Sequence, residues 1–305
     1  MNRLGMIGVG DMGRPLALRL LRAGFPLTVY DVNPDAVRVL EQAGAVAAQS
    51  AYDVACQAQT VLACLPSPEV SERVALGEGG VSGGSAIQHY IEMSTIGQAT
   101  MERIDRGLAE RSIGLLDAPV SGGVVGERAG RLICFVASPR ERFLAIEPAL
   151  RGLSDRLFHV GDRPGQAQVL KVANNMMNSA NLVLAIEMVL MAKRAGIDES
   201  TAIEVINVST GRSRATEETF KAQILNHEFN TGVRLNIISK DVGLAIEQAR
   251  AFGVEHSAAL AAAELWKAAD RHGFGEVDVS HIYHYIAGDD VKTARTRVNR
   301  DGGHP

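Results

Sequence analysis

The chain has 305 residues, of which 46% are hydrophobic and 22% are charged, and its formal net charge is −4. A chain of this length is more typical of two domains than of one, and the composition is that of a globular protein. The slightly acidic balance argues against a nucleic-acid partner, because such a partner requires a basic face.

Two features bear on the cellular compartment. The first apolar run begins at Leu4, which leaves no room for a signal peptide, and no uninterrupted apolar run approaches the roughly 18 residues that span a bilayer. The cysteines Cys56, Cys64 and Cys134 show no CxxC spacing, so neither a disulfide framework nor a zinc site is indicated. We therefore expect a cytoplasmic protein with no membrane partner and no bound metal.

The first half of the chain alternates short apolar runs with amphipathic stretches. Strands separated by helices need crossover connections, and these produce a parallel sheet that is covered on both faces. The expected strands are 4–9, 27–30, 60–65, 90–94, 114–118 and 132–137. The expected helices between them include 12–23, 35–43, 99–110 and 140–150.

The second half of the chain carries only helical patterns. A long helix is expected from Gly165 to Ala195, ending at Gly196 as a glycine C-cap does. Further helices are expected at 200–208, 239–251, 257–271 and 280–287. The sequence thus predicts an α/β domain followed by an all-helical domain. The boundaries are residues 1–162 for the first, 163–290 for the second and 291–305 for a polar tail.

A run of glycines follows the first expected strand and opens the first expected helix. In a GxGxxG pattern the first glycine permits a tight turn, the second lets the backbone approach a diphosphate, and the third lets helix and strand pack closely. The alternative is a plain strand–helix–strand unit whose glycines serve ordinary turns. The pattern predicts a Rossmann-type doubly wound parallel sheet that binds a dinucleotide through Gly8, Val9, Gly10, Asp11, Met12 and Gly13.

Asp31 ends the second expected strand, about 20 residues after Gly8, where an acidic side chain accepts hydrogen bonds from the adenosine ribose. A carboxylate there repels the additional phosphate of NADP. The segment 31–34 holds no arginine to receive that phosphate, although Arg38 lies further along. We therefore expect NAD to be preferred, with NADP as the alternative cofactor.

A second glycine-rich segment, Asp117-Ala-Pro-Val-Ser-Gly-Gly123, follows the end of a strand. The hydroxyl of Ser121 and the backbone N–H groups of Gly122 and Gly123 offer several donors, which would suit a carboxylate. The alternative is a turn that binds no ligand.

The long helix carries a polar stripe on an otherwise apolar surface. Lys171, Asn174, Asn175 and Asn178 fall within an arc of roughly 100° on a 3.6-residue helix. Burying such a stripe is expensive without a purpose. The stripe favours Lys171 as a general acid/base on the substrate oxygen, with an asparagine one helical turn away, Asn174 or Asn175, orienting the same group. The alternative is a lysine whose stem reaches to solvent, with asparagines bonded to neighbouring loops.

Weaker signals come from the rest of the helical half. Lys240 opens a late helix, and most lysines in that setting are solvated. Arg212 and Arg214 follow Gly211 and are either surface residues or the ligands of a second anionic group. The pair His281 and His284 has no acidic or cysteine partner at metal-ligand spacing, so no metal is expected there.

Together these segments resemble the β-hydroxyacid dehydrogenase family, which includes 3-hydroxyisobutyrate dehydrogenase and tartronate semialdehyde reductase and is related to 6-phosphogluconate dehydrogenase. The resemblance extends over roughly residues 4–287. It rests on the glycine pattern 8–13, Cys64-Leu-Pro-Ser67, Ser94-Thr95, the segment 117–123, Lys171-x-x-Asn-Asn175 and Lys240-Asp241.

The resemblance implies roles for individual residues. Lys171 would be the catalytic lysine, and Asn175 with Ser121, Gly122 and Gly123 would bind the carboxylate and hydroxyl of the substrate. Leu65, Pro66, Thr95 and Lys240 would line the cofactor. The chain departs from the family where Gly165 lies six residues before Lys171 instead of four, and where Val233 replaces a common phenylalanine.

The resemblance predicts an NAD(P)-dependent oxidoreductase that acts on a small β-hydroxy acid or on the corresponding semialdehyde. An imine reductase and a catalytically silent NAD(P)-binding sensor or scaffold are the alternatives, and the presence of Lys171 argues against both. The long helix is apolar on most sides between Asn178 and Met191, so we also expect a homodimer or homotetramer.

Overall fold

The computed structural model describes residues 3–122, 132–154 and 156–291 and divides into two compact units, Met1–Lys171 and Val172–Pro305. The division falls inside the long helix, between Lys171 and Val172. The start of that helix belongs to unit 1 because its backbone is hydrogen-bonded to Asp117, which ends a strand of unit 1. The predicted polar tail falls almost wholly outside the described residues.

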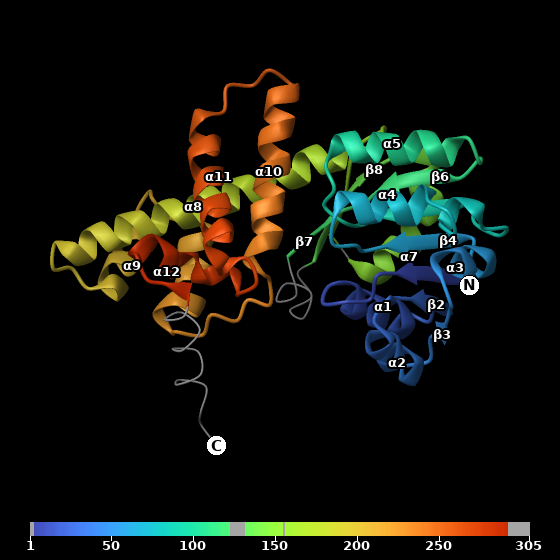
Figure 1. Ribbon diagram of the computed structural model, residues 1–305, viewed down its shortest axis with the longest axis horizontal. Coiled ribbons are helices and arrows are strands. Elements are labelled where there is room, and N and C mark those ends of the chain that lie inside the picture. The colour runs from blue at the N-terminus through green and yellow to red at the C-terminus, as the bar shows by residue number, and fades with distance from the viewer. Residues whose placement is uncertain (1–2, 123–131, 155, 292–305) are drawn as a thin grey trace. The chain divides into compact units, whose positions relative to one another are not determined.

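Unit 1 is built on a mixed, mainly parallel sheet with the strand order β3-β2-β1-β4-β5-β6-β8-β7, and β9 pairs with β8 (Figure 1). All neighbours from β3 to β6 are parallel, as predicted. The order reverses at β1, which lies between β2 and β4. In open α/β sheets the ligand binds at such a switch point, beyond the carboxyl ends of the strands.

The predicted strands are all present, with bounds shifted by a few residues at most. They are β1 (Leu4–Ile7), β2 (Leu27–Tyr30), β4 (Thr60–Ala63), β5 (His89–Glu92), β6 (Gly114–Asp117) and β8 (Ile133–Ala137). Three strands were not predicted: β3 (Val46–Ala47), β7 (Val120–Ser121) and β9 (Arg156–Gly161). The antiparallel pairing of β8 with β6 and β7 was also not predicted. The strands β3 and β7 have two residues each and are too short to show the alternating pattern of a strand.

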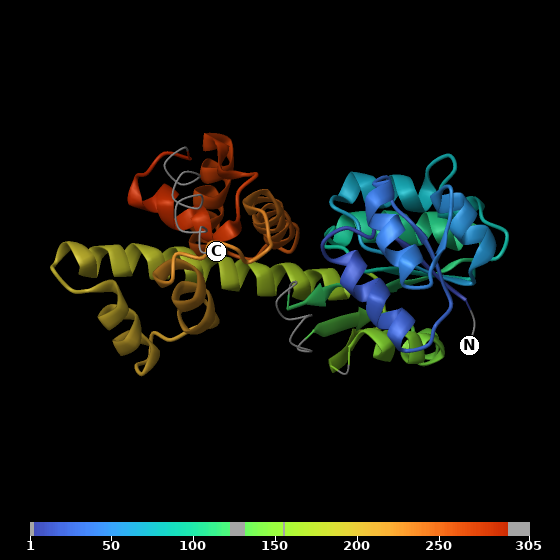
Figure 2. The same ribbon diagram turned by 90° about the horizontal axis from the view of Figure 1, so that it is seen from below.

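Helices cover both faces of the sheet (Figure 2). One apolar layer joins the sheet to α1 (Gly13–Arg22), α2 (Pro34–Gln42) and α7 (Arg140–Leu153). The other joins it to α3 (Ala51–Gln57), α4 (Pro68–Leu76) and α5 (Gln98–Ala109). A single-turn 3₁₀ helix lies at Val81–Gly83. The two-layer burial explains why the central strands are apolar on nearly every residue.

Among the described residues of unit 2, the regular secondary structure is helical, apart from a single β-bridge between Arg234 and Asp278. Its core surrounds the fully buried side chains of Trp266, Phe220 and Phe274. The helices are α8 (Gln166–Arg194, which begins in unit 1), α9 (Glu199–Asn207), α10 (Leu235–Ala251), α11 (Ser257–Ala269) and α12 (Ile282–Ala287). The segments Ala215–Leu225 and Asp270–Phe274 are π-helical, and Val279–His281 is a 3₁₀ turn.

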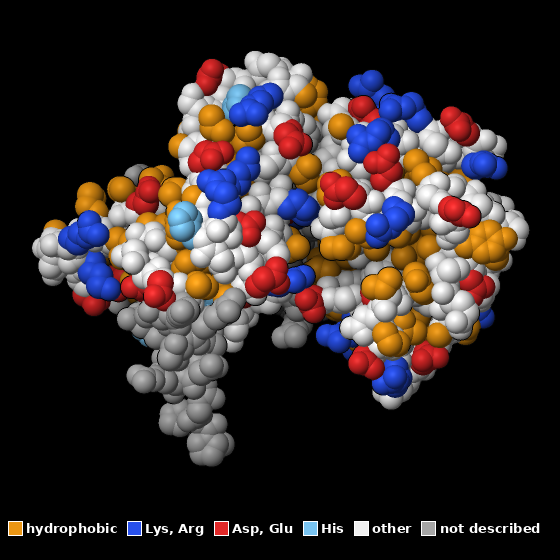
Figure 3. Space-filling model, viewed as in Figure 1, with side chains coloured by type: hydrophobic (Ala, Val, Ile, Leu, Met, Phe, Trp, Pro, Cys, Tyr) orange, Lys and Arg blue, Asp and Glu red, His pale blue; other side chains and the backbone are white. Residues whose placement is uncertain are grey.

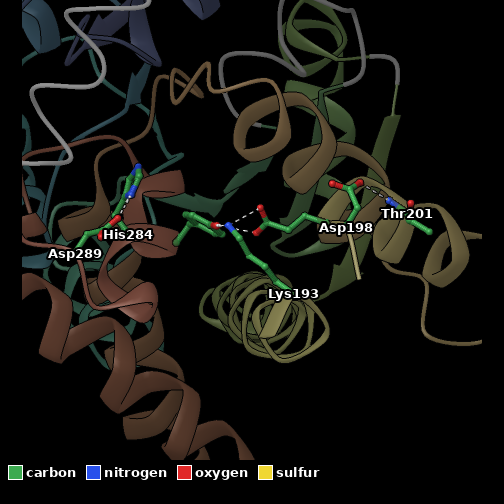
Figure 4. A network of polar contacts seen from close by, with 7 residues as sticks. Lys193, Asp198, Thr201, His284 and Asp289 are labelled. Carbon is green, nitrogen blue, oxygen red and sulfur yellow. Dashed lines mark hydrogen bonds and ion pairs between the residues drawn. The ribbon is translucent and has the colours of Figure 1, made fainter. Parts of the chain in front are cut away.

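The carboxyl end of α8 is tied to two other helices (Figure 4). Lys193 Nζ lies 2.9 Å from Glu199 Oε2, and the hydroxyl of Tyr283 donates to Glu199 Oε1 at 2.7 Å. Asp198 accepts a hydrogen bond from Thr201 N and so caps α9. These contacts join α8, α9 and α12 into one framework within unit 2.

Among the described residues, α8 is the one helix long and apolar enough to cross a membrane by length and composition. The count of uninterrupted apolar residues in the sequence did not identify it, because lysine and asparagine interrupt the run. One face of α8 contributes Ile186 and Val189, both fully buried, to the core of unit 2.

Candidate cofactor and active site

The glycine loop joins β1 to α1 at the switch point of the sheet. Gly8 has a φ of 81°, a left-handed conformation that favours glycine. A Cβ on Gly13 would collide with the carbonyl oxygen of Gly8, whereas a Cβ on Gly10 would meet nothing within 4 Å. Two of the glycines are therefore required by the fold. The third leaves space beside the backbone, as the approach of a diphosphate requires.

The start of α1 differs from the starts of the next three helices. Asn33, Ser50 and Ser67 cap α2, α3 and α4 with their side chains. Met12 supplies no such cap, and the first turn of α1 holds no acidic residue. The N–H groups at the positive end of α1 are thus left for an anionic ligand, so this end fits the diphosphate of a dinucleotide.

Asp31 follows β2 and reaches back to the glycine loop. Its Oδ2 accepts a hydrogen bond from Val9 N at 2.7 Å, and its Oδ1 accepts one from Asn33 N at 2.8 Å. These bonds hold the half-buried carboxylate beside the loop, where the sequence predicts the ribose. Arg38, the distant candidate for a phosphate ligand, pairs instead with Asp35 at 2.7 Å on the exposed side of α2.

The predicted cofactor residues of the next two loops are connected through Ser94. Leu65 N donates to Ser94 Oγ at 2.7 Å, and Ser94 N donates to Glu92 Oε1 at 3.0 Å. Glu92 is completely buried, and this burial raises the pKa of its carboxyl group. Leu65 and Thr95 are half-buried at these loops, and Pro66 is exposed.

The predicted substrate residues of unit 1 lie on the short strand β7. Ser121 pairs with Ile133 of β8 and is half-buried, and Gly122 follows it with a φ of 127°. A positive φ at Gly122 turns its backbone out of the strand. Gly123 lies outside the described residues.

Asp117, at the end of β6, binds the first turn of α8. Its Oδ2 accepts hydrogen bonds from the backbone N–H groups of Gly165, Ala167 and Gln168 at 2.8, 3.0 and 3.1 Å. Its Oδ1 accepts a fourth from Gln168 Nε2 at 2.8 Å. Burial raises the pKa of the Asp117 carboxyl to about 7, against the opposing effect of these four donors. Gln168 is not among the site residues predicted from the sequence.

Lys171 lies on α8 three residues after Gln168. Its side chain is buried, with 8% of the residue exposed. This exposure argues against the alternative in which the stem reaches to solvent. The structure also explains why the glycine lies six residues before Lys171 instead of four. Gly165 has a φ of 99°, which favours glycine, and its N–H donates to Asp117. Ala167 stands where the family has glycine, and its N–H donates to the same carboxyl group.

The asparagines of the polar stripe differ in their surroundings. Asn174 and Asn178 are exposed, whereas Asn175 is half-buried. Asn175 Nδ2 donates to Asp241 Oδ2 at 2.6 Å, and Lys240 Nζ lies 2.7 Å from Asp241 Oδ1. Asp241 therefore joins two predicted site residues of unit 2, and its side chain is only 4% exposed. Lys240 is thus ion-paired near the start of α10 and is not a solvated surface lysine.

Three of the residues that gave weaker sequence signals, His281, His284 and Arg214, have partners within the protein. His281 stacks on Phe229 with ring centroids 4.6 Å apart, and His284 Nδ1 lies 2.9 Å from Asp289. The described residues contain no group of three His, Cys, Asp or Glu side chains that would hold a metal. Arg214 pairs with Glu218 on the exposed side of its π-helical segment.

The glycine loop, the open start of α1 and Asp31 define a dinucleotide-binding unit, and the buried lysine of α8 adds a group suited to proton transfer. The protein is accordingly an NAD(P)-dependent oxidoreductase. Comparison with known families agrees, since residues 3–161 match the NAD-binding domain of 6-phosphogluconate dehydrogenase. Residues 165–286 match the NAD-binding domain of NADP-dependent 3-hydroxyisobutyrate dehydrogenase.

Individual relatives cover nearly all of the chain. A 2-(hydroxymethyl)glutarate dehydrogenase of Eubacterium barkeri is 30% identical over 92% of this chain and 93% of its own. A 3-hydroxyisobutyrate dehydrogenase of Pseudomonas aeruginosa is 33% identical over 82% and 86%. The chain belongs to the β-hydroxyacid dehydrogenase family.

Solved structures support the same assignment. A 3-hydroxyisobutyrate dehydrogenase from Mycobacterium tuberculosis, solved with L-serine, has a TM-score of 0.85 at 26% identity and covers 94% of this chain and 99% of its own. An imine reductase from a Pseudomonas species has a TM-score of 0.60 at 18% identity, with 93% and 99% covered. That level of identity shows a shared fold alone. The Rossmann-type fold with a helical second domain and the hydroxyacid dehydrogenase class are thereby confirmed.

Proposed function

We propose that Lys171 is the general acid/base in hydride transfer between NAD(P) and the hydroxyl-bearing carbon of a small β-hydroxy acid. The observation that carries this proposal is the burial of Lys171 on α8, one helical turn before an asparagine that is itself held by a buried carboxylate. A lysine retained in such a setting is costly unless its amine is used.

The reaction requires one group of the protein that accepts a proton from the substrate. The proton of the substrate hydroxyl passes to Lys171 Nζ, the carbon-bound hydrogen leaves as hydride with its electron pair, and the carbon–oxygen bond becomes a carbonyl. When bound, the nicotinamide ring supplies the acceptor for that hydride. In the reverse direction the same amine donates the proton to a semialdehyde.

Each predicted site residue has a role in this proposal. Ser121, Gly122 and Gly123 bind the substrate carboxylate, and Asn175 orients the hydroxyl, with Asn174 beside it on α8. The diphosphate lies at the open start of α1, and Asp31 binds the adenosine ribose, which favours NAD over NADP. The cofactor contacts are Gly8, Val9, Gly10, Asp11, Met12, Gly13, Asp31, Leu65, Pro66, Thr95 and Lys240.

The names of the relatives suggest a substrate class. Hydroxymethylglutarate, 3-hydroxyisobutyrate and L-serine share a hydroxymethyl group on the carbon next to a carboxylate and differ only in a third substituent. We propose that the substrate of this protein carries the same hydroxymethyl–carboxylate unit. Val233, which is smaller than the common phenylalanine, and the exposed Arg212 favour a larger or second anionic substituent.

Replacement of Lys171 by alanine tests the catalytic proposal. Proton transfer by a positioned side chain contributes roughly 10²–10⁴-fold in rate, so kcat should fall by at least about a hundredfold. NADH formation over a panel of the three hydroxymethyl acids measures kcat. Cofactor affinity, measured by calorimetry, should stay within about threefold, because Lys171 is not among the proposed cofactor contacts.

A matched variant controls for changes to the helix itself. Lys193→Ala removes a lysine from the last turn of the same helix and should leave kcat unchanged. A Lys171→Ala protein that keeps more than about a tenth of the wild-type kcat would contradict the general-base role. Turnover of cyclic imines, with none of the acids oxidised, would favour the imine reductase alternative.

We propose further that two copies of the chain associate along α8. The exposed face of this helix carries a seven-residue repeat of large apolar side chains at Leu170, Met177, Leu184 and Met191, and Met177 is 68% exposed. Figure 3 shows exposed hydrophobic side chains at the left, over the region that the carboxyl end of α8 occupies in Figure 1. A repeat of this period is typical of helices that pair with one another.

The oligomeric state tests this association. Sedimentation at micromolar concentration should give a dimer or larger assembly, and Met177→Glu with Leu184→Glu should shift it toward the 32.5 kDa monomer. Val208→Glu is the control, because Val208 is 88% exposed but lies off this stripe. A wild-type protein that sediments only as a monomer would contradict the proposal. We also propose domain limits of 1–162 and 163–290 and a cytoplasmic location.

A further inference from the structure

The side chain of Gln168 is the centre of a four-way junction in unit 1. Its Oε1 accepts hydrogen bonds from Ile96 N at 2.9 Å and Gly97 N at 3.1 Å. Its Nε2 donates to Ser94 O at 3.1 Å and to Asp117 Oδ1 at 2.8 Å. A glutamine amide has two donor hydrogens and an oxygen with two lone pairs, so every polar position of this fully buried side chain is used.

The junction connects two segments that the proposed reaction brings into use. On one side lies the turn Ser94–Gly97, which contains the proposed cofactor residue Thr95. On the other lies the first turn of α8, where Gln168 and Lys171 are three residues apart and so share a face of the helix. The Gln168 amide therefore fixes the position of the helix segment that carries Lys171 relative to the Ser94–Gly97 turn.

We propose that Gln168, held by Asp117, is a positioning residue that sets the Lys171 amine relative to the Ser94–Gly97 turn. This inference rests on the proposed role of Lys171. A misplacement of about 1 Å in a reacting group can cost on the order of a hundredfold in rate. Loss of the junction should therefore lower turnover while the lysine itself is retained.

The geometry separates positioning from simple support of the helix. Asp117 Oδ2 binds three backbone N–H groups at the start of α8, those of Gly165, Ala167 and Gln168, without any help from the Gln168 side chain. The helix start should therefore persist in Gln168→Leu, whereas the link to Ile96, Gly97 and Ser94 is lost. We expect kcat to fall by about a hundredfold and KM to change by less than about threefold.

Gln166→Leu is the matched control for this variant. Gln166 lies two residues earlier on α8, and its Oε1 accepts from Arg163 N, so the substitution removes a polar contact from the same helix start without touching the junction. The control should keep kcat within about threefold. An equal loss in both variants, or a Gln168→Leu protein with more than a third of wild-type kcat, would overturn the proposal.

Gln168→Glu tests the junction through its pH profile. The new carboxyl lies where Nε2 was, against Asp117 Oδ1, and two carboxyls this close share one proton. The other titratable groups nearby are Glu92, which is the register partner of Asp117 on β5, and Cys134 on β8, whose pKa burial raises to about 12. When the shared proton is lost at higher pH, two carboxylates repel each other and the junction opens.

The expected profile has the opposite slope to that of the wild type. Oxidation by the wild-type protein should rise with pH as the lysine loses its proton, whereas oxidation by Gln168→Glu should fall. The double variant Asp117→Asn/Gln168→Glu restores a donor–acceptor pair between these two side chains with a single charge, so the part of the alkaline loss that comes from their repulsion should disappear. A purely structural role predicts profiles parallel to the wild type, and parallel profiles would refute the positioning role.

Hydrogen exchange in the protein without cofactor supplies an independent readout. In Gln168→Leu, exchange should accelerate in peptides that contain Ile96 and Gly97, whose N–H groups lose their acceptor, and should keep the wild-type rate in control peptides from α11. If Lys171→Ala keeps its activity while the exchange still accelerates, the proposed function fails and the junction stands. If Lys171→Ala is inactive but these amides are unchanged in Gln168→Leu, the positioning proposal fails alone.

Discussion

Two helices of unit 1 begin with opposite arrangements of their backbone N–H groups. At the start of α1 no side chain caps the helix, and a glycine leaves open space beside the loop. At the start of α8 a buried carboxylate from β6 accepts three N–H groups at once. The same electrostatic feature, the positive end of a helix, is thus left open in one place and filled by the protein's own carboxyl group in the other.

The difference separates binding from positioning. An open start can receive the diphosphate of a cofactor and release it again, because no internal group competes for the N–H donors. At the start of α8, the hydrogen bonds to Asp117 fix the backbone in place, and the same N–H groups can no longer bind an anionic ligand. The residue that benefits from the order is Lys171, which follows one turn later and whose proposed role depends on where its amine lies.

The largest expected effect comes from filling the open start. Gly10→Val adds a side chain where a Cβ meets no atom within 4 Å, so the fold should tolerate it. The side chain would instead occupy the approach of the diphosphate, and the dissociation constant for NAD should rise by about a hundredfold, or about 2.7 kcal/mol. Calorimetric titration with NAD measures this change, and thermal unfolding without cofactor checks the fold.

Gly13→Ala provides the contrast. A Cβ at Gly13 would collide with the carbonyl oxygen of Gly8, so this smaller substitution should lower the melting temperature of the protein without cofactor. If Gly10→Val instead binds NAD normally, the diphosphate does not approach the backbone at this glycine, and the open start of α1 has another use.

A smaller effect is expected from the titration of the closed start. Burial raises the pKa of Asp117 to about 7 from an ordinary value of 3.8. Between these values the folded protein holds a proton that the unfolded chain has lost, so the free energy of unfolding should decrease as pH rises, by at most about 1.4 kcal/mol per pH unit. Urea unfolding at pH 5 and pH 7.5 measures the slope, and Asp117→Asn should reduce it.

Asp53→Asn is the matched control for this slope. Asp53 also accepts a backbone N–H, from Gln49, but this bond lowers the pKa of its carboxyl, so the group titrates below the chosen pH window. The Asp53 variant should keep the wild-type slope. Equal slopes in wild type and Asp117→Asn would show that the Asp117 carboxyl does not hold its proton across this window.

The sequence predicted the open start of α1 far better than the closed start of α8. The glycine loop and Asp31 belong to one strand–helix–strand unit, and their spacing follows from local geometry. The bond between Asp117 and Gln168 joins residues 51 apart, and the bond between Asn175 and Asp241 joins residues 66 apart. No periodicity in a single sequence reports such pairings. The two-residue strands β3 and β7 were missed for the related reason that their pairing, not their pattern, makes them strands.

The smallest expected effect concerns cofactor choice at Asp31. Its two oxygens already accept from Val9 N and Asn33 N, and they remain acceptors on their other lone pairs for ribose hydroxyls. Asp31→Asn keeps one acceptor oxygen but removes the charge that repels the phosphate of NADP. The ratio of kcat/KM for NAD over NADP should therefore fall, by about tenfold, which corresponds to roughly 1.4 kcal/mol of lost repulsion and hydrogen bonding.

Asp35→Asn, on the exposed side of α2 where it pairs with Arg38, is the control and should leave that ratio nearly unchanged. A wild-type protein that favours NADP would contradict the preference outright. An unchanged ratio in Asp31→Asn would mean that this carboxylate only braces the loop through Val9 and that another group selects the cofactor.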